Sequence, residues 1–139
     1  MKILYASVIA LSAAAAPLTA ETMENDGDLI RSRDITGGTI YAATDAERAN
    51  WLGWGSYDSI GENWRDIGQI EDVVLGEDGQ MVGVVAEVGG FLDIADKHVM
   101  ISLDDVSLVP ADDEEYAVVT NKTEEELDSM QGVDEGYWD

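Results

Sequence analysis

Histidine and cysteine, the usual residues of a nucleophilic catalytic site, are scarce in this chain. His98 is the one histidine among 139 residues, and there is no cysteine. Asp93 and Asp96 stand close before His98 and could pair with its imidazole, but a serine-type triad also needs a nucleophile and oxyanion donors. Ser102 would share a strand face with His98 yet stand well apart from it, and no Gly-x-Ser-x-Gly elbow occurs. We therefore expect no catalytic residue and no enzymatic activity, with Lys97 and His98 pairing locally with Asp93 or Asp96.

The same composition argues against a metal centre or a cofactor. One histidine and no cysteine leave only carboxylates as further zinc ligands. Acidic runs occur at Asn25–Asp28, Asp104–Asp105 and Asp112–Glu115, but none has the spacing of an EF-hand loop. Acidic clusters usually form a solvated face, and no glycine-rich loop precedes a helix as in a nucleotide site. We expect no cofactor and no metal site, with calcium binding by the acidic loops left open.

Aromatic side chains interleaved with glycine form the first candidate binding group. It contains Trp51, Trp54, Tyr57 and Trp64. Such rings can make a flat platform for a sugar ring or for the apolar side chain of a partner. A small domain also uses aromatic rings for burial, as a cover over one end of its barrel. Both interpretations remain open on the sequence alone.

The second candidate binding segment is a loop that runs from Gly89 to His98. It contains Gly89, Gly90, Phe91, Asp93, Asp96, Lys97 and His98. The two glycines permit a sharp turn. Phe91 then either fills the core or protrudes as an anchor for a partner.

The charge balance restricts the classes of partner. The chain carries 30 acidic and 7 basic side chains, a formal net charge of −23. Such a field repels nucleic acid and anionic lipid head groups. It favours cationic partners, divalent ions or simple solubility in a salty exterior, where salt screens the self-repulsion. We expect no nucleic-acid partner.

The first twenty residues have the pattern of a secretory signal peptide. Lys2 precedes an uncharged apolar run from Ile3 to Ala16, and Ala20 stands before Glu21 at a small-residue cleavage site. The run is too short to span a bilayer, which needs about 20 apolar residues. We therefore expect residues 1–20 to be removed, residues 21–28 to form a flexible acidic leader, and the mature protein to be periplasmic without a stable membrane anchor.

Alternation and turn residues predict the elements that position these candidates. Two apolar-rich runs at residues 67–75 and 81–88 flank Asp78-Gly79, a pair that favours a tight hairpin turn. Further short strands are expected at residues 39–42, 98–101, 106–109 and 116–120. A short helix is expected from Asp45 to near Trp51, and another after Thr123, whose side chain can form a capping box with Glu126.

The order and spacing of several segments resemble the PRC-barrel family. The segments are Ile30–Gly37 and Ile67–Leu75 as opening strands, Asp78–Gln80, Val82–Val85, Gly89–Leu92 and Lys97–Val99 in the middle, and Val118–Thr120 with Thr123–Leu127 at the end. The resemblance implies a mainly β fold, a small strongly bent β-barrel with a short C-terminal helix. The domain would span residues 29–131, with a helical and aromatic insert at residues 43–66 and an acidic tail at residues 132–139.

The resemblance also implies a function. Members of the family contact other macromolecules, in the photosynthetic reaction centre and in ribosome maturation, and the family has no catalytic residues to carry over. This chain has no transmembrane helix like that of the reaction-centre subunit, and its acidity argues against a ribosomal role. We expect a periplasmic, non-catalytic binding or assembly module that contacts a protein partner, with pairing to a second copy also open. The alternative is a protein that binds a small ligand or a divalent cation, such as a carbohydrate or calcium.

Overall fold

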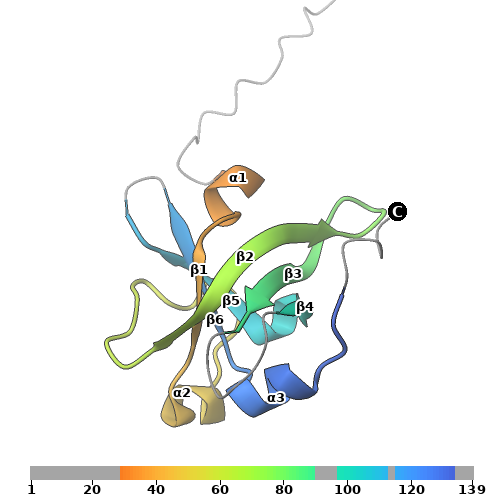
Figure 1. Ribbon diagram of the computed structural model, residues 1–139. Coiled ribbons are helices and arrows are strands. Elements are labelled where there is room, and N and C mark those ends of the chain that lie inside the picture. The colour runs from red at the N-terminus through yellow and green to blue at the C-terminus, as the bar shows by residue number, and fades with distance from the viewer. Residues whose placement is uncertain (1–28, 90–96, 113–114, 134–139) are drawn as a thin grey trace, which may run out of the picture.

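The computed structural model describes residues 29–89, 97–112 and 115–133, and these form a mainly β domain (Figure 1). Six strands make one sheet in the order β4-β3-β2-β1-β6-β5. The strands are β1 (Thr39–Ala42), β2 (Arg65–Leu75), β3 (Met81–Val88), β4 (Lys97–Ser102), β5 (Val106–Pro110) and β6 (Tyr116–Thr120). All six lie where alternation and turn residues predict them.

The sheet bends into an open barrel. Neighbouring strands are antiparallel except for β1 and β6, which are parallel, with Ile40 beside Val118. The ladders of the described residues leave β4 and β5 as the two edges. These strands are joined through the short 3-10 helix η2 (Leu103–Asp105). The strongly bent β-barrel implied by the family resemblance is therefore confirmed, as a bent sheet that does not close.

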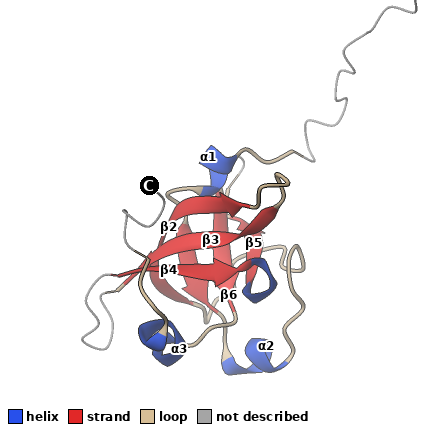
Figure 2. Ribbon diagram, turned by 90° about the vertical axis from the view of Figure 1, so that its right-hand side faces the viewer, coloured by secondary structure: helices blue, strands red, loops and turns tan. Residues whose placement is uncertain are grey.

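Short helices lie at both ends of the barrel. Helix α1 (Ser32–Ile35) lies at one end, and α2 (Asp45–Ala49) and α3 (Glu124–Ser129) lie at the other (Figure 2). The inward residues of the strands form the main core, for example Ile40, Val84 and Ile101, which are fully buried. Ile35 of α1 and Leu127 of α3 pack into the same core. The helices thus cover the ends that the sheet leaves open.

Strand β2 is curved along its length (Figure 1). It pairs with β1 on one side and with β3 on the other, and the register shifts once against β1 and twice against β3. Gly68 lies where β2 and β3 approach closely, with a φ of 150°. A Cβ atom there would stand 1.9 Å from the Glu87 carbonyl oxygen. Only glycine allows the two backbones to approach so closely.

The helices and turns differ in detail from the predictions. Residues 32–35 of the expected opening strand form α1 instead, because Asp34 accepts hydrogen bonds from the Arg31 backbone and guanidinium and closes a helical turn. Helix α2 is capped by Thr44 and not by Asp45, and it ends at Ala49. In the hairpin turn, the Gly79 N–H donates a hydrogen bond to the Gly76 carbonyl. Of the two glycines in this turn, Gly79 has a positive φ and Gly76 does not.

Helix α3 begins as predicted, with one difference. The Thr123 hydroxyl accepts a hydrogen bond from the Glu126 amide at 3.0 Å. The Glu126 carboxylate faces Lys122 at 3.7 Å, an ion pair that the capping-box prediction did not include. Among the described residues, no helix is long and apolar enough to cross a membrane. The predicted signal peptide, the leader and most of the tail lie outside the described residues.

Replacing Gly68 tests whether the bend requires the close approach of the β2 and β3 backbones at this position. Gly68→Ala should lower the free energy of unfolding by about 3 kcal/mol or more, because the new Cβ atom would overlap backbone that cannot move away. Gly79→Ala is the matched control, since its φ is also positive but no atom lies within 4 Å of its Cβ position. That control should cost only about 1–2 kcal/mol. Urea denaturation measures both, and equal losses would contradict this account of the bend.

Candidate functional site

Three of the four predicted aromatic residues form a second, smaller core. The ring centroids of Trp51 and Tyr57 are 5.4 Å apart, and those of Tyr57 and Trp64 are 5.6 Å apart. The rings pack on Val109 and Val119, which point away from the main core. The insert therefore covers the outer face of β5 and β6 and not an end of the barrel. This explains why β6 is apolar at consecutive positions.

Hydrogen bonds fasten the insert to the barrel. The Trp51 indole N–H donates to the Asp104 carbonyl at 2.9 Å, and the Gly55 amide donates to the Ser107 hydroxyl at 3.0 Å. The Trp64 indole N–H donates to the Glu47 carboxylate at 2.5 Å. These contacts join a loop of the insert to η2, β5 and α2, so the loop has a defined conformation.

Trp54 is the member of the aromatic group that does not join this packing. Its side chain is 40% exposed, while Leu52 and Ile60 of the same loop are 69% and 36% exposed. We call Leu52, Trp54 and Ile60 the insert surface. The four aromatic residues therefore make no continuous platform: three are used for packing and one faces solvent. The exposure of Leu52 and Ile60 in the same loop was not predicted from the sequence.

Glu47 joins the aromatic core to α2. One of its carboxylate oxygens accepts hydrogen bonds from the Thr44 amide, the Thr44 hydroxyl and the Trp64 indole. Burial alone would raise the pKa of Glu47, but these hydrogen bonds outweigh it and hold the pKa below its usual value. The Tyr57 hydroxyl lies close by, buried and without good hydrogen-bond geometry to its neighbour Leu52, and burial raises its pKa.

The second predicted segment is described only at its two ends. Gly89 lines a small cavity of about 180 Å³ together with Gly68, Gln69 and Glu87. Gly90, Phe91, Asp93 and Asp96 lie outside the described residues. Their pairing with Lys97 and His98 therefore stays a prediction.

Lys97 and His98 point to different places from neighbouring positions of β4. The Lys97 ammonium donates to the carbonyls of Asp128 and Met130 at the end of α3, at 2.9 Å and 2.6 Å. The His98 Nε2 atom lies 3.9 Å from a Glu71 carboxylate oxygen and 4.0 Å from a Glu87 one. A hydrogen bond between the two carboxyl groups raises the pKa of Glu71. Sequence reasoning missed both glutamates, because only strand register brings them to His98.

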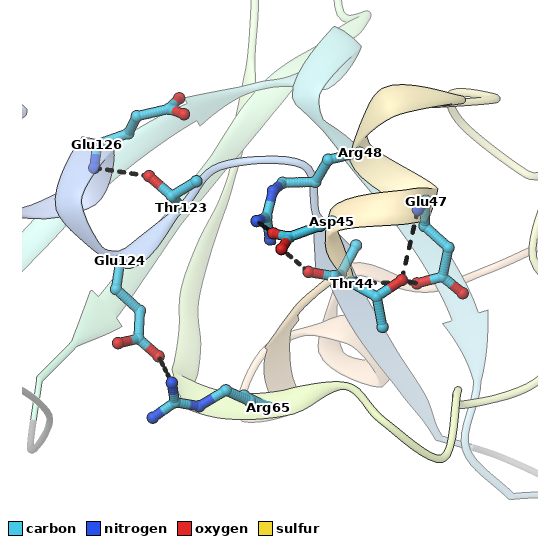
Figure 3. A network of polar contacts seen from close by, with 9 residues as sticks. Thr44, Asp45, Glu47, Arg48, Arg65, Thr123, Glu124 and Glu126 are labelled. Carbon is cyan, nitrogen blue, oxygen red and sulfur yellow. Dashed lines mark hydrogen bonds and ion pairs between the residues drawn. The ribbon is translucent and has the colours of Figure 1, made fainter.

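A polar cleft lies between α2, α3 and the start of β2 (Figure 3). It encloses about 450 Å³ and is lined by Ala42, Ala43, Thr44, Asp45, Arg48, Asn63, Arg65, Thr123, Glu124 and Glu125. Arg48 pairs with Asp45 and donates to the Ala43 carbonyl, and Arg65 lies 3.0 Å from the Glu124 carboxylate. The cleft therefore offers hydrogen-bonding groups, and its two arginines are each paired with an acidic side chain of the lining. It was not predicted, because its walls come from distant parts of the chain.

Asp105, from one of the acidic runs considered above for calcium binding, makes contacts that stabilise the fold. The Asp105 carboxylate accepts from the Asn121 side chain at 3.1 Å and faces Lys122 at 3.6 Å. Its carbonyl accepts from the Thr120 hydroxyl at 2.8 Å. Asp105 thus holds η2 against the end of β6. Asn25–Asp28, Asp113 and Glu114, from the other acidic runs, lie outside the described residues.

The Glu47 contacts predict a pH-dependent stability. At neutral pH, Glu47→Gln should lower the free energy of unfolding by about 1 kcal/mol, because hydrogen bonds to a charged acceptor are lost. A carboxyl group with a lowered folded pKa stabilises above its unfolded pKa, and this contribution disappears as the pH falls through the folded value. Urea denaturation at neutral and acidic pH should therefore show a difference that shrinks on acidification. The exposed Glu62→Gln control should show none, and a difference for Glu47→Gln that is constant with pH would contradict the assignment.

Comparison with known proteins identifies the family. A family model described as PRC-barrel domain matches residues 57–126, which is half of the chain. The matched region runs from the aromatic core through β2–β6 into α3. Comparisons with curated proteins and with solved structures gave no match. The bent six-stranded sheet agrees with this assignment, and the chain belongs to the PRC-barrel domain family.

Proposed function

We propose that this protein is an exported, non-catalytic binding module that contacts a protein partner through the insert surface. The observation that carries this proposal is the exposure of Leu52, Trp54 and Ile60 on one loop that is fastened to the barrel. Single exposed apolar residues are common on protein surfaces. Three large exposed apolar residues within nine positions of one loop, itself held by hydrogen bonds, are better suited to binding a partner than scattered single ones.

The rigidity of the loop favours affinity. A segment already held in its bound conformation loses little conformational entropy when a partner docks. Trp51, Tyr57 and Trp64 pack the loop against the barrel, so the backbone that carries Trp54 is held in place. Tryptophan is also among the residues that contribute most to binding energy at protein interfaces. These features support Trp54 as the anchor of the contact.

The charge around the insert surface indicates the chemistry of the partner. Residues 50–64 contain Asp58 and Glu62 but no lysine or arginine, and the chain carries a net charge of −23. A partner with an apolar pocket rimmed by lysine or arginine would complement this surface. The negative electrostatic field of the whole chain would also increase the association rate with such a partner at low ionic strength.

Site-directed crosslinking tests the contact. Benzoylphenylalanine in place of Leu52 or Trp54 should give the same adduct with one protein in cells, whereas the same replacement of the exposed Leu75 in β2 should not. Mass spectrometry identifies the adduct. Equal yields from position 75, or no adduct from either insert position, would contradict the proposal. An adduct with a second copy of this acidic chain would contradict the charge argument and establish a homo-oligomer instead.

Affinity measurements with the identified partner then test the anchor. Trp54→Ala should weaken binding by at least about 30-fold, the effect of losing a buried aromatic anchor. Leu75→Ala, which removes a side chain that is 58% exposed elsewhere, should leave the affinity nearly unchanged. Binding should also weaken as salt is added. Loss of affinity in both variants to the same degree would count against a specific role of Trp54.

The export part of the proposal rests on the order of charge, apolar run and small residue in residues 1–20. Cell fractionation should recover the protein from the periplasm. The intact mass of that protein should correspond to a chain that begins at Glu21. A full-length chain in the cytoplasmic fraction would contradict export, without bearing on the insert surface.

The polar cleft favours a second candidate function, the binding of a small polar ligand. Its volume of about 450 Å³ lies within the usual range of ligand sites, roughly 300–1,000 Å³. Side chains such as Asn63 and Arg65 could hydrogen-bond the hydroxyl groups of a sugar. A thermal-shift screen with monosaccharides and disaccharides should then find a ligand whose stabilising effect is lost in Asn63→Ala. A screen without such a ligand would leave the protein contact as the sole proposal.

A further inference from the structure

We propose that Glu71, Glu87 and His98 form a binding site for a divalent transition-metal ion of the zinc type. This site is separate from the insert surface and does not depend on the proposed protein contact. It also revises the expectation of no metal site, which was based on a count of histidines and cysteines along the sequence.

The backbone of three adjacent strands positions the ligands. Glu87 in β3 is the register partner of His98 in β4, so their side chains leave the same face of the sheet. On the other side of β3, the register with β2 shifts between Ile70 and Asp72. Glu71 is the extra residue of this bulge, and a bulge redirects the side chain that it carries. The three side chains thus converge from paired strands and not from loops.

The distances suit a small cation. The His98 Nε2 atom lies 3.9 Å from Glu71 Oε1 and 4.0 Å from Glu87 Oε2. One ligand atom from each of the three residues lies within 4.8 Å of the other two. Ligands of a tetrahedral zinc ion stand about 3.4 Å apart, since each lies about 2.0–2.2 Å from the metal. Small side-chain rotations would close this gap without any movement of the strands.

The acidic character of the cluster also favours the binding of a cation. The carboxyl groups of Glu71 and Glu87 lie together in a strongly acidic chain, and within residues 29–89, 97–112 and 115–133 their one salt-bridge partner is His98. A bound metal ion would displace the proton that the two groups share. The neighbouring Lys97 is engaged at the end of α3. The side chains of His98, Glu87 and Glu71 are 30%, 38% and 42% exposed. An ion can therefore reach them from solvent and keep water in its remaining positions.

The ligand set selects the class of ion. Calcium and magnesium prefer cages made only of oxygen atoms, whereas an imidazole nitrogen suits zinc, copper, nickel and iron. One imidazole and two carboxylates leave a fourth position open, as in zinc sites with three protein ligands. Zinc itself is the simplest probe, because it has no redox chemistry.

Calorimetric titration with zinc tests the site. The purified protein, produced without a polyhistidine tag, is titrated in excess magnesium so that weak carboxylate binding is suppressed. One equivalent of zinc should bind. His98→Ala and Glu87→Gln should each weaken zinc binding on the order of 100-fold or more, a loss at least as large as that from removing an outer-shell partner of a metal ligand. Glu77→Gln, which neutralises an exposed glutamate in the hairpin turn, should change the affinity less than about twofold.

Nuclear magnetic resonance gives a second, direct reading. Because His98 is the one histidine, its imidazole carbon–proton signals are unique in the spectrum. Zinc at one equivalent should shift them, and the same amount of calcium should not. Unchanged zinc affinity in His98→Ala, or imidazole signals that do not move with zinc, would overturn the proposal even if zinc binds elsewhere on the acidic surface.

Discussion

The close approach of the β2 and β3 backbones at Gly68 is the constraint on which the rest of this domain depends. The strand must pair on both sides while it bends, and a side chain at this position would meet the Glu87 carbonyl. The bend has consequences at both ends of β2. At its start, Arg65 reaches the Glu124 carboxylate of α3, and the preceding Trp64 reaches Glu47 of α2. Beyond the bend, the bulge sets Glu71 beside Glu87 and His98.

The sheet is apolar on both faces where the insert covers it, and this arrangement explains how residues 43–66 pack on the barrel. The inner face packs on Ile35 and Leu127 from the helices, while Val109 and Val119 on the outer face pack under Trp51, Tyr57 and Trp64. The insert is therefore part of the folded unit and not an appendage. Leu52, Trp54 and Ile60 are the large apolar residues of this insert that stay exposed.

The sequence predicted elements better than it predicted sites. Alternation and the Asp78-Gly79 pair were sufficient for the hairpin and for the other strands, because each depends on neighbours along the chain. Residues 32–35 were mistaken for part of a strand, since the closing of α1 depends on one local pair, Arg31 with Asp34. The meeting of Glu71 with His98 could not be foreseen, because it depends on strand order, register and a bulge. The hydrogen bonds from Lys97 to the end of α3 could not be foreseen either, because they join segments far apart in the sequence.

The parallel pairing of β1 with β6 has a consequence for how the chain is made. Ile40 pairs with Gly68 of β2 on one side and with Val118 of β6 on the other, so the second of these ladders can form only after β6 has been made. A ribosome releases the chain from its N-terminus, so β1 to β4 emerge before β5 and β6, which complete the sheet. Contacts between residues so far apart in sequence make folding slow. Until β6 emerges, the side of β1 that β6 will cover, with Ile40 at its centre, has no partner strand.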